Sequence, residues 1–105
     1  MLDIYPVALD IARVAASAFQ HIAQHDSDLA RQLRRAATSV PLNIAEGSAG
    51  IGGNRRQRYA TALGSAREAK ACFDLAVAMG YVPALAADDD NRFSHVIGTL
   101  VKLTR

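Results

Sequence analysis

Residues 28–47, with the sequence DLARQLRRAATSVPLNIAEG, contain the pattern that decides the fold. Their apolar residues recur at spacings of three and four, which places them within one sector of a helix roughly 80–100° wide. These residues are Leu29, Leu33, Ala36, Ala37, Val40 and Ile44. Such a stripe must face a core, so we expect an amphipathic helix that starts near Asp28. Pro41 removes one backbone hydrogen bond and should kink this helix without ending it, because the apolar period continues to Ile44.

A preceding helix is expected over residues 6–24. Pro6 suits the first turn of a helix, and apolar residues follow it at helical spacing. These apolar residues are Val7, Ile11, Val14, Ala18 and Ile22. The polar residues 25–28 then form a short connection, in which Asp26 or Ser27 can cap the next helix by accepting a free backbone N–H group.

Four glycines fall among residues 47–54 and are expected to end the helix that begins near Asp28. Asn54 can cap a third helix over residues 55–79, with Gly80 as its stop. The apolar face of this helix consists of Tyr59, Ala62, Leu63, Ala66, Ala69, Phe73, Ala76 and Val77.

A last helix is expected to start at Asp88, Asp89 or Asp90, which can cap it and interact favourably with its dipole. Its inward residues are Phe93, Val96, Ile97, Leu100 and Val101. Helices of similar length joined by short connections place neighbours antiparallel. The chain of 105 residues is long enough for one domain. We therefore expect residues 1–105 to form a single all-α domain, an antiparallel up-and-down four-helix bundle.

The sequence indicates a cytoplasmic protein. Charged residues such as Asp10, Arg13 and Arg31 interrupt every candidate for the roughly 20 apolar residues that span a bilayer. The first residues lack a basic segment followed by an apolar stretch, so they do not predict a secretory signal. The single cysteine, Cys72, cannot form an internal disulfide, in agreement with a reducing compartment.

Candidate residues for catalysis are few. His21 and His25 have the i, i+4 spacing of helical metal ligands, but a catalytic zinc ion usually takes three protein ligands. Cys72 has no His or Asn partner nearby, which favours a buried small residue over a nucleophile. The glycine-rich residues 47–54 lack the Gly-Lys-Ser/Thr of a nucleotide-binding loop. We expect no catalytic residues, no metal and no cofactor, and therefore no enzymatic activity.

Basic residues concentrate in the middle of the chain. Residues 31–70 carry eight basic side chains and two acidic ones, although the whole chain has a net charge of only +2. This region either contacts nucleic acid or is an ordinary solvated surface. The arginines expected to contact phosphate are Arg34, Arg35, Arg55, Arg56 and Arg58. Tyr59 is the one aromatic residue beside them in sequence, so base stacking is expected to be slight.

The expected helix 55–79 has a second non-polar stripe, opposite its core face. This stripe consists of Ala60, Gly64, Ala71, Leu75 and Ala78. Small side chains permit close helix approach, which suggests contact with another subunit. The alternative is that the alanines are simply good helix formers, although Gly64 weakens a helix. Leu42 also points away from the core stripe of its own helix, and we expect it to join the oligomer interface.

A polar stripe follows residues 28–46. It consists of Asp28, Gln32, Arg35, Ser39, Asn43 and Glu46. Two interpretations remain open: a hydrogen-bonding network with other helices or subunits, or plain exposure to solvent.

Residues 32–47, QLRRAATSVPLNIAEG, resemble a segment of the four-helix bundle proteins encoded by intervening sequences of 23S ribosomal RNA genes. Residues 64–68, GSARE, resemble the Gly-Ser-x-x-Glu segment of that family, and residues 79–82, MGYV, resemble the end of its third helix. The resemblance covers most of the chain. Residues 51–54, IGGN, depart from the family's pattern by their additional glycine.

The resemblance implies a bundle that assembles as a ring of five and has no established enzymatic activity. It extends to the accessory protein of diversity-generating retroelements, a nucleic-acid-binding partner of a reverse transcriptase. We therefore expect a homopentamer that binds RNA or DNA through a basic surface. The alternative is a scaffold or accessory subunit that binds a reverse transcriptase or another protein without touching nucleic acid. No membrane partner is expected.

Overall fold

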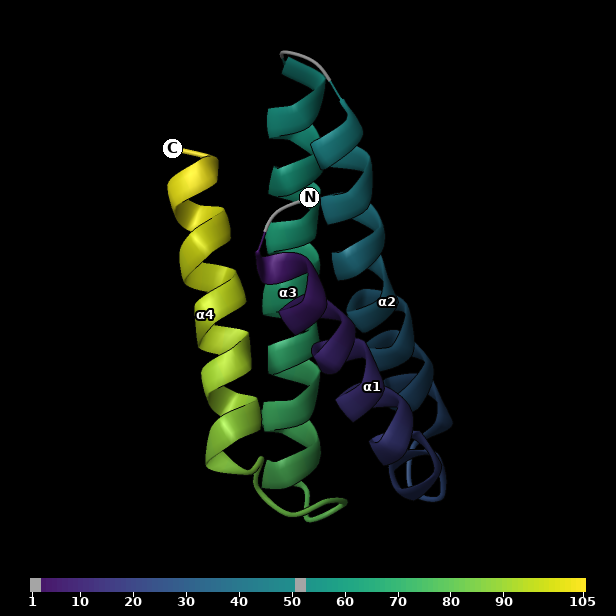
Figure 1. The fold of residues 1–105 in the computed structure, drawn as a ribbon. Coiled ribbons are helices and arrows are strands. Elements are labelled where there is room, and N and C mark those ends of the chain that lie inside the picture. The colour runs from purple at the N-terminus through teal and green to yellow at the C-terminus, as the bar shows by residue number, and fades with distance from the viewer. Residues whose placement is uncertain (1–2, 51–52) are drawn as a thin grey trace.

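The computed structural model describes residues 3–50 and 53–105, which form four α-helices and, in this part of the chain, no strand. The helices are α1 (Ile4–Ala23), α2 (Ser27–Ala49), α3 (Gly53–Ala78) and α4 (Ala87–Leu103). Each helix packs against the next one in the chain, and α4 packs against α1 (Figure 1). The predicted all-α, up-and-down four-helix bundle is confirmed.

The core face of α2 is the one that its periodicity predicts, since all six residues of its apolar stripe are buried. In α1 the prediction is partly wrong. Ile11 and Ile22 are buried as expected, but Val7 and Val14 are only partly buried, and the alanines Ala8 and Ala15 lie in the core instead. Small alanine side chains let α1 approach both α2 and α4, so its buried face is turned toward them.

The ends of the helices follow the predicted capping in one case out of three. The Asp26 carboxylate accepts a hydrogen bond from the Leu29 backbone N–H at 2.9 Å and caps α2 as predicted. Asn54 is not a cap, because α3 already begins at Gly53. The residue that precedes α4 is Ala86, which has no side-chain cap. Asp88–Asp90 lie in the first turn of α4, where their charges still face the positive end of the helix.

Two residues expected to disturb α2 lie inside it. The helix continues through Pro41, which is buried, to Ala49, so Pro41 does not end it. Gly47 is buried within the helix against the ring of Tyr59. The helix ends at Ala49, with Gly50 as the next residue, so the prediction that the glycine-rich residues 47–54 end α2 is confirmed. A Cβ atom at Gly47 would lie only 2.5 Å from Cε1 of Tyr59. Glycine is therefore required here by the close approach of α3. The positive φ of 77° that favours glycine occurs instead at Gly80, two residues beyond the last residue of α3, which confirms Gly80 as the predicted stop of that helix.

Candidate nucleic-acid interface

Three of the five predicted arginines lie together at one end of the bundle, where α3 begins. Arg55, Arg56 and Arg58 are exposed in the first turns of α3. The guanidinium of Arg56 donates a hydrogen bond to the carbonyl oxygen of Thr104, which places the end of α4 beside the start of α3. This contact brings two further exposed cations, Lys102 and Arg105, to the same end.

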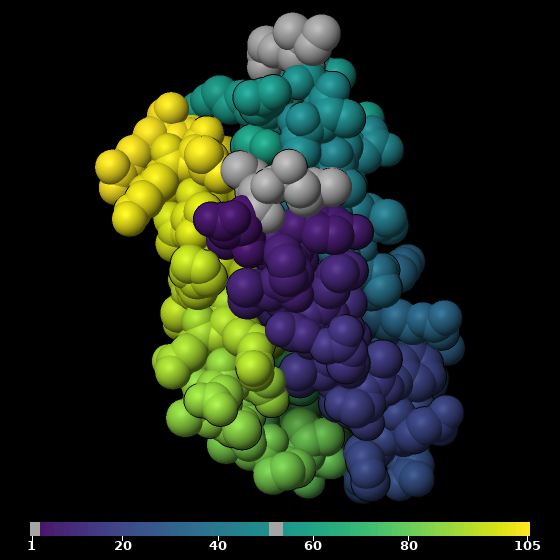
Figure 2. Space-filling view, in the orientation of Figure 1, coloured from purple at the N-terminus to yellow at the C-terminus, as the bar shows by residue number. Residues whose placement is uncertain are grey.

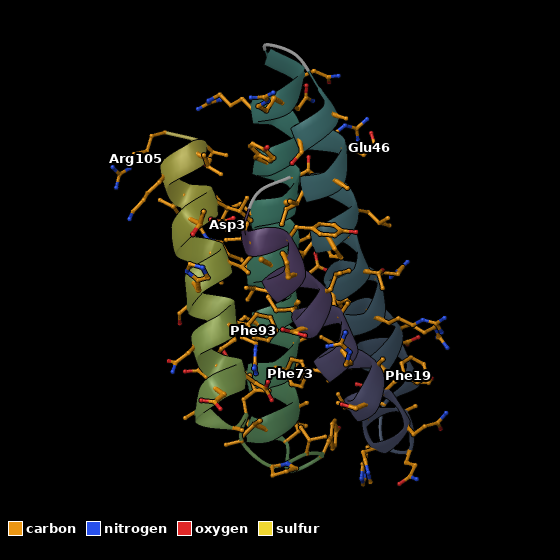
Figure 3. The ribbon with its side chains drawn as sticks, in the orientation of Figure 1. Asp3, Phe19, Glu46, Phe73, Phe93 and Arg105 are labelled. Atoms are coloured by element: carbon orange, nitrogen blue, oxygen red, sulfur yellow. The ribbon has the colours of Figure 1, made fainter. Side chains whose placement is uncertain are left out.

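We call Arg55, Arg56, Arg58, Lys102 and Arg105 the basic end. Figure 3 shows Arg105 at the free end of α4, on the same half of the molecule as Glu46 near the end of α2. Local charge does not single out Lys102 and Arg105, because residues 71–105 as a whole are slightly acidic. Lys102 could have been found from its position in the last turn of α4, because the negative end of the helix dipole favours a cation there.

The arginines of the basic end remain available to a ligand. Arg58 lies 3.6 Å from the Glu46 carboxylate, and Arg55 donates to the carbonyl oxygen of Gly50 at 3.2 Å. All of these side chains are exposed, and an exposed ion pair contributes only about 0–1 kcal/mol. The first turn of α3 adds backbone N–H groups that have no partner within the helix, which suits an anion.

Arg34 and Arg35 form a separate group on α2. The Ser65 hydroxyl donates to the Ser39 hydroxyl at 2.8 Å and fixes which levels of α2 and α3 face each other. Arg35 lies one turn from this contact in one direction, and Arg58 lies two turns away in the other. At a rise of about 1.5 Å per residue, the two arginines are roughly 16 Å apart along the bundle. The five predicted arginines thus form two groups in one chain, not one surface.

Tyr59 is not available to stack on a base. Its side chain is 4% exposed, its ring covers Gly47, and its hydroxyl lies 3.3 Å from the Ser48 hydroxyl. The aromatic residue beside the predicted arginines is instead Phe19 of α1. The Arg34 guanidinium lies 5.6 Å from the centre of the Phe19 ring, a cation–π geometry.

Part of the polar stripe of α2 is a hydrogen-bonding network with α3. The Asn43 amide donates to the Ser39 hydroxyl and to the Ser39 carbonyl oxygen, each at 2.9 Å, and Ser65 of α3 completes the network. Arg35, Gln32 and Asp28 at the other end of the stripe are exposed. Both interpretations of the stripe therefore hold, each for a different part of it.

The residues proposed as an oligomer interface all lie on the surface of the single chain. They are Leu42, Ala60, Gly64, Ala71, Leu75 and Ala78. The side chains of Leu42 and Leu75 are 65% and 50% exposed, and Met79, at 58%, extends the apolar strip on α3. A Cβ atom at Gly64 would meet no atom within 4 Å, so this helix face is open. Their contact with another subunit stays a prediction.

Acidic residues cluster where α4 begins and α3 ends, away from the basic end. Asp88, Asp89 and Asp90 begin α4 there, close to Asp74 near the end of α3. Lys70 lies between the two helices, 2.5 Å from Asp74 and 3.6 Å from Asp90. Its hydrogen bond to Asp74 and the charges of both carboxylates raise its pKa, although burial opposes this. We call Asp74 and Asp88–Asp90 the acidic end.

The histidines and the cysteine are not arranged as a catalytic or metal site. His25 lies beyond the end of α1 and stacks on the Tyr81 ring, with ring centres 4.7 Å apart and planes within 3°. The ring of His25 is thus packed against Tyr81. Cys72 is buried, and burial, with the nearby Glu68 charge, raises the pKa of its thiol. Within residues 3–50 and 53–105, no three His, Cys, Asp or Glu side chains are grouped to hold a metal ion.

The helices of the described residues also lack an apolar window long enough to cross a bilayer. Every one of the four is interrupted by charged residues.

Comparison with known proteins identifies both fold and family. A crystal structure of a protein with unknown function from the S23 ribosomal protein family of Bacteroides thetaiotaomicron superposes with a TM-score of 0.81, over 97% of this chain and 98% of that one. The two sequences are 16% identical, so this likeness shows the fold alone. No match is found among curated proteins. The model of the 23S rRNA-intervening sequence protein family matches residues 1–100, and the chain belongs to that family.

Proposed function

We propose that this protein is a non-enzymatic, homo-oligomeric bundle that binds the phosphate backbone of RNA or DNA through its basic end. The observation that supports this proposal is the convergence of five exposed cations from α3 and α4, with Glu46 as the one acid paired to any of them among the described residues. Arg34 and Arg35 provide a second contact along the same strand of nucleic acid.

Arginine suits this task because its planar guanidinium donates two parallel hydrogen bonds to a phosphate. The contacts are individually weak, since the groups are exposed. A ring of identical subunits repeats them, and the second and later contacts then form at a high effective concentration. Binding of this kind reads charge and not base sequence, so it depends steeply on salt.

The experiment compares two double variants of equal charge change. Arg55→Glu with Arg56→Glu removes two cations of the basic end, whereas Arg13→Glu with Arg92→Glu removes two cations that pair with Asp10 and Asp89 in their own helices. Affinity for a single-stranded oligonucleotide is measured by fluorescence anisotropy at several salt concentrations. Size-exclusion chromatography with light scattering records the mass of each variant.

We expect the Arg55/Arg56 variant to lose most of its affinity at low salt and the Arg13/Arg92 variant to keep nearly all of it. Each phosphate contact contributes roughly 0.7 to the slope of log K against log salt for a single strand. The slope should therefore fall by about 1.4 in the first variant for each subunit that contacts the strand. Equal losses in both variants, or no binding by the native protein at low salt, would contradict the proposal.

A protein scaffold is the second candidate function, and the exposed side chains of Leu75 and Met79, which lie one turn apart, favour it. Exposed apolar side chains that lie close together commonly mark contacts between proteins. Burial of apolar surface depends little on salt, whereas phosphate binding weakens with it. A partner that stays bound at high salt would support this second function.

A further inference from the structure

A hollow of about 240 Å³ lies between α1 and α2. Three alanines form its floor, Ala12, Ala15 and Ala16, and the side chains of Phe19 and Arg34 border it. Figure 2 shows α1 and α2 meeting along one side of the molecule, and Figure 3 shows Phe19 near the end of α1, where it adjoins α2. Alanine side chains fill little space, which leaves the hollow open beside the ring of Phe19.

A second hollow adjoins the first and shares Arg34 and Thr38 with it. Arg31 and Arg35 also line this second hollow. Asp28 is the single acid among the residues that line the two, and it forms an ion pair with Arg31. None of the ion pairs within the described part of the chain involves Arg34 or Arg35. The two hollows thus combine an aromatic ring with uncompensated positive charge.

We propose that this groove, bordered by Phe19 and Arg34, binds one unpaired base of a single-stranded nucleic acid. The base stacks on the Phe19–Arg34 pair over the alanine floor, and Arg35 binds the adjoining phosphate. This inference rests on the proposed function and adds to it a contact with a base, whereas the basic end contacts phosphate alone.

The chemistry of the groove favours a base over other ligands. Aromatic rings and guanidinium planes are the two surfaces on which proteins stack unpaired bases. Phe19 and Arg34 both border the hollow, with the guanidinium 5.6 Å from the ring centre, so a base placed there contacts one surface of each kind. The hollow is smaller than the roughly 300–1,000 Å³ of sites for drug-sized ligands, which suits a single planar base better than a whole cofactor. A duplex keeps its bases stacked inside, so the ligand must be single-stranded.

The test uses two labelled strands that carry equal numbers of phosphates, an oligothymidylate and an abasic strand of the same length. Binding is measured by fluorescence anisotropy for the native protein and for Phe19→Leu, which keeps apolar bulk but removes the aromatic ring. Tyr81→Leu is the matched control, because Tyr81 is also a partly buried aromatic residue but lies in the connection between α3 and α4.

We expect Phe19→Leu to lower affinity for oligothymidylate roughly 5- to 150-fold, the range for loss of one stacked base, and to leave affinity for the abasic strand unchanged. Tyr81→Leu should change neither affinity. In the native protein, a 2-aminopurine base placed in the strand should lose fluorescence on binding, because stacking quenches it, and Phe19→Leu should restore that fluorescence.

The outcomes separate this inference from the function on which it rests. Failure of the native protein to bind either strand at low salt refutes phosphate binding itself. Equal affinity for the two strands, or no loss of 2-aminopurine fluorescence, overturns the base site and leaves phosphate binding intact. An equal loss for both strands in Phe19→Leu also overturns the base site, because the ring would then act through the fold or through the position of Arg34.

Discussion

Gly47 allows a direct measurement of how closely α2 and α3 pack. Replacement by alanine adds one methyl group, which would lie 2.5 Å from Cε1 and 2.7 Å from Cδ1 of Tyr59. Both distances are far below van der Waals contact, so the Tyr59 ring must move. Tyr59 is 4% exposed, and its displacement also disturbs the 3.3 Å contact between its hydroxyl and that of Ser48.

Two opposing effects decide the net change in the free energy of unfolding. Alanine is favoured over glycine inside a helix by about 0.8–1.0 kcal/mol. Overpacking of a core by one group costs about 1–3 kcal/mol. We therefore expect Gly47→Ala to destabilise the protein by about 0–2 kcal/mol.

Gly98→Ala is the matched control, because Gly98 lies inside α4 and an added Cβ atom would meet nothing within 4 Å. The free energy of unfolding of this variant should rise by about 0.8–1.0 kcal/mol, the full preference of a helix interior for alanine over glycine. The two variants should thus differ by about 1–3 kcal/mol, the cost of overpacking.

Urea unfolding followed by circular dichroism, at one fixed protein concentration, gives both values. The Tyr59→Leu background provides a double-mutant cycle, in which Gly47→Ala should no longer be unfavourable. Stabilisation of the native protein by Gly47→Ala to the same extent as by Gly98→Ala would refute the reasoning, since the ring would then have moved without cost.

Three further predictions concern the cap of α2, the exposed face of α3 and the buried thiol. Asp26→Ala should lower the free energy of unfolding by about 0.5–2 kcal/mol, because the Leu29 N–H loses its acceptor; an unchanged urea midpoint would exclude the cap. Gly64→Leu should reduce the mass in light scattering to that of a monomer while helix content is retained, and an intact oligomer would show that this face is not the interface. Cys72 should react with iodoacetamide far more slowly in the folded than in the unfolded protein. Because its pKa is raised on folding, its contribution to stability is complete below the unfolded pKa of about 8.5 and decreases as pH rises above it.

The architecture could be predicted because it depends on spacing within each helix. The apolar residues of α2 recur so regularly that all six are buried as expected. Alanine weakens this kind of prediction, because it is compatible with core and surface alike. In α1 the buried residues include Ala8 and Ala15, which contribute little hydrophobic contrast to the pattern.

Glycine could not be interpreted correctly from composition alone. Gly47 belongs to a glycine-rich stretch and looks like the end of a helix, yet it is a contact point for Tyr59, a residue of the next helix. A turn and a close approach both require the absence of a side chain. Only the position of the neighbouring helix distinguishes the two.

The candidate site could be predicted in its parts and not in its arrangement. The arginines were identified by local charge, which is a property of the sequence. Their grouping depends on contacts between distant residues, such as Arg56 with Thr104 and Arg34 with Phe19. Helical spacing places residues on one helix and carries no information about which turn of another helix lies beside them.

The five cations of the basic end lie at one end of a molecule whose longest dimension is 43 Å. Charges are screened over about 8 Å at physiological ionic strength. In the proposed binding of nucleic acid, a polyanion therefore attracts mainly the end that it approaches, and the resulting torque turns the basic end forward during the last steps of diffusion. Such steering raises the rate of productive collisions more than the strength of the final complex, and added salt should slow association even where the bound contacts survive.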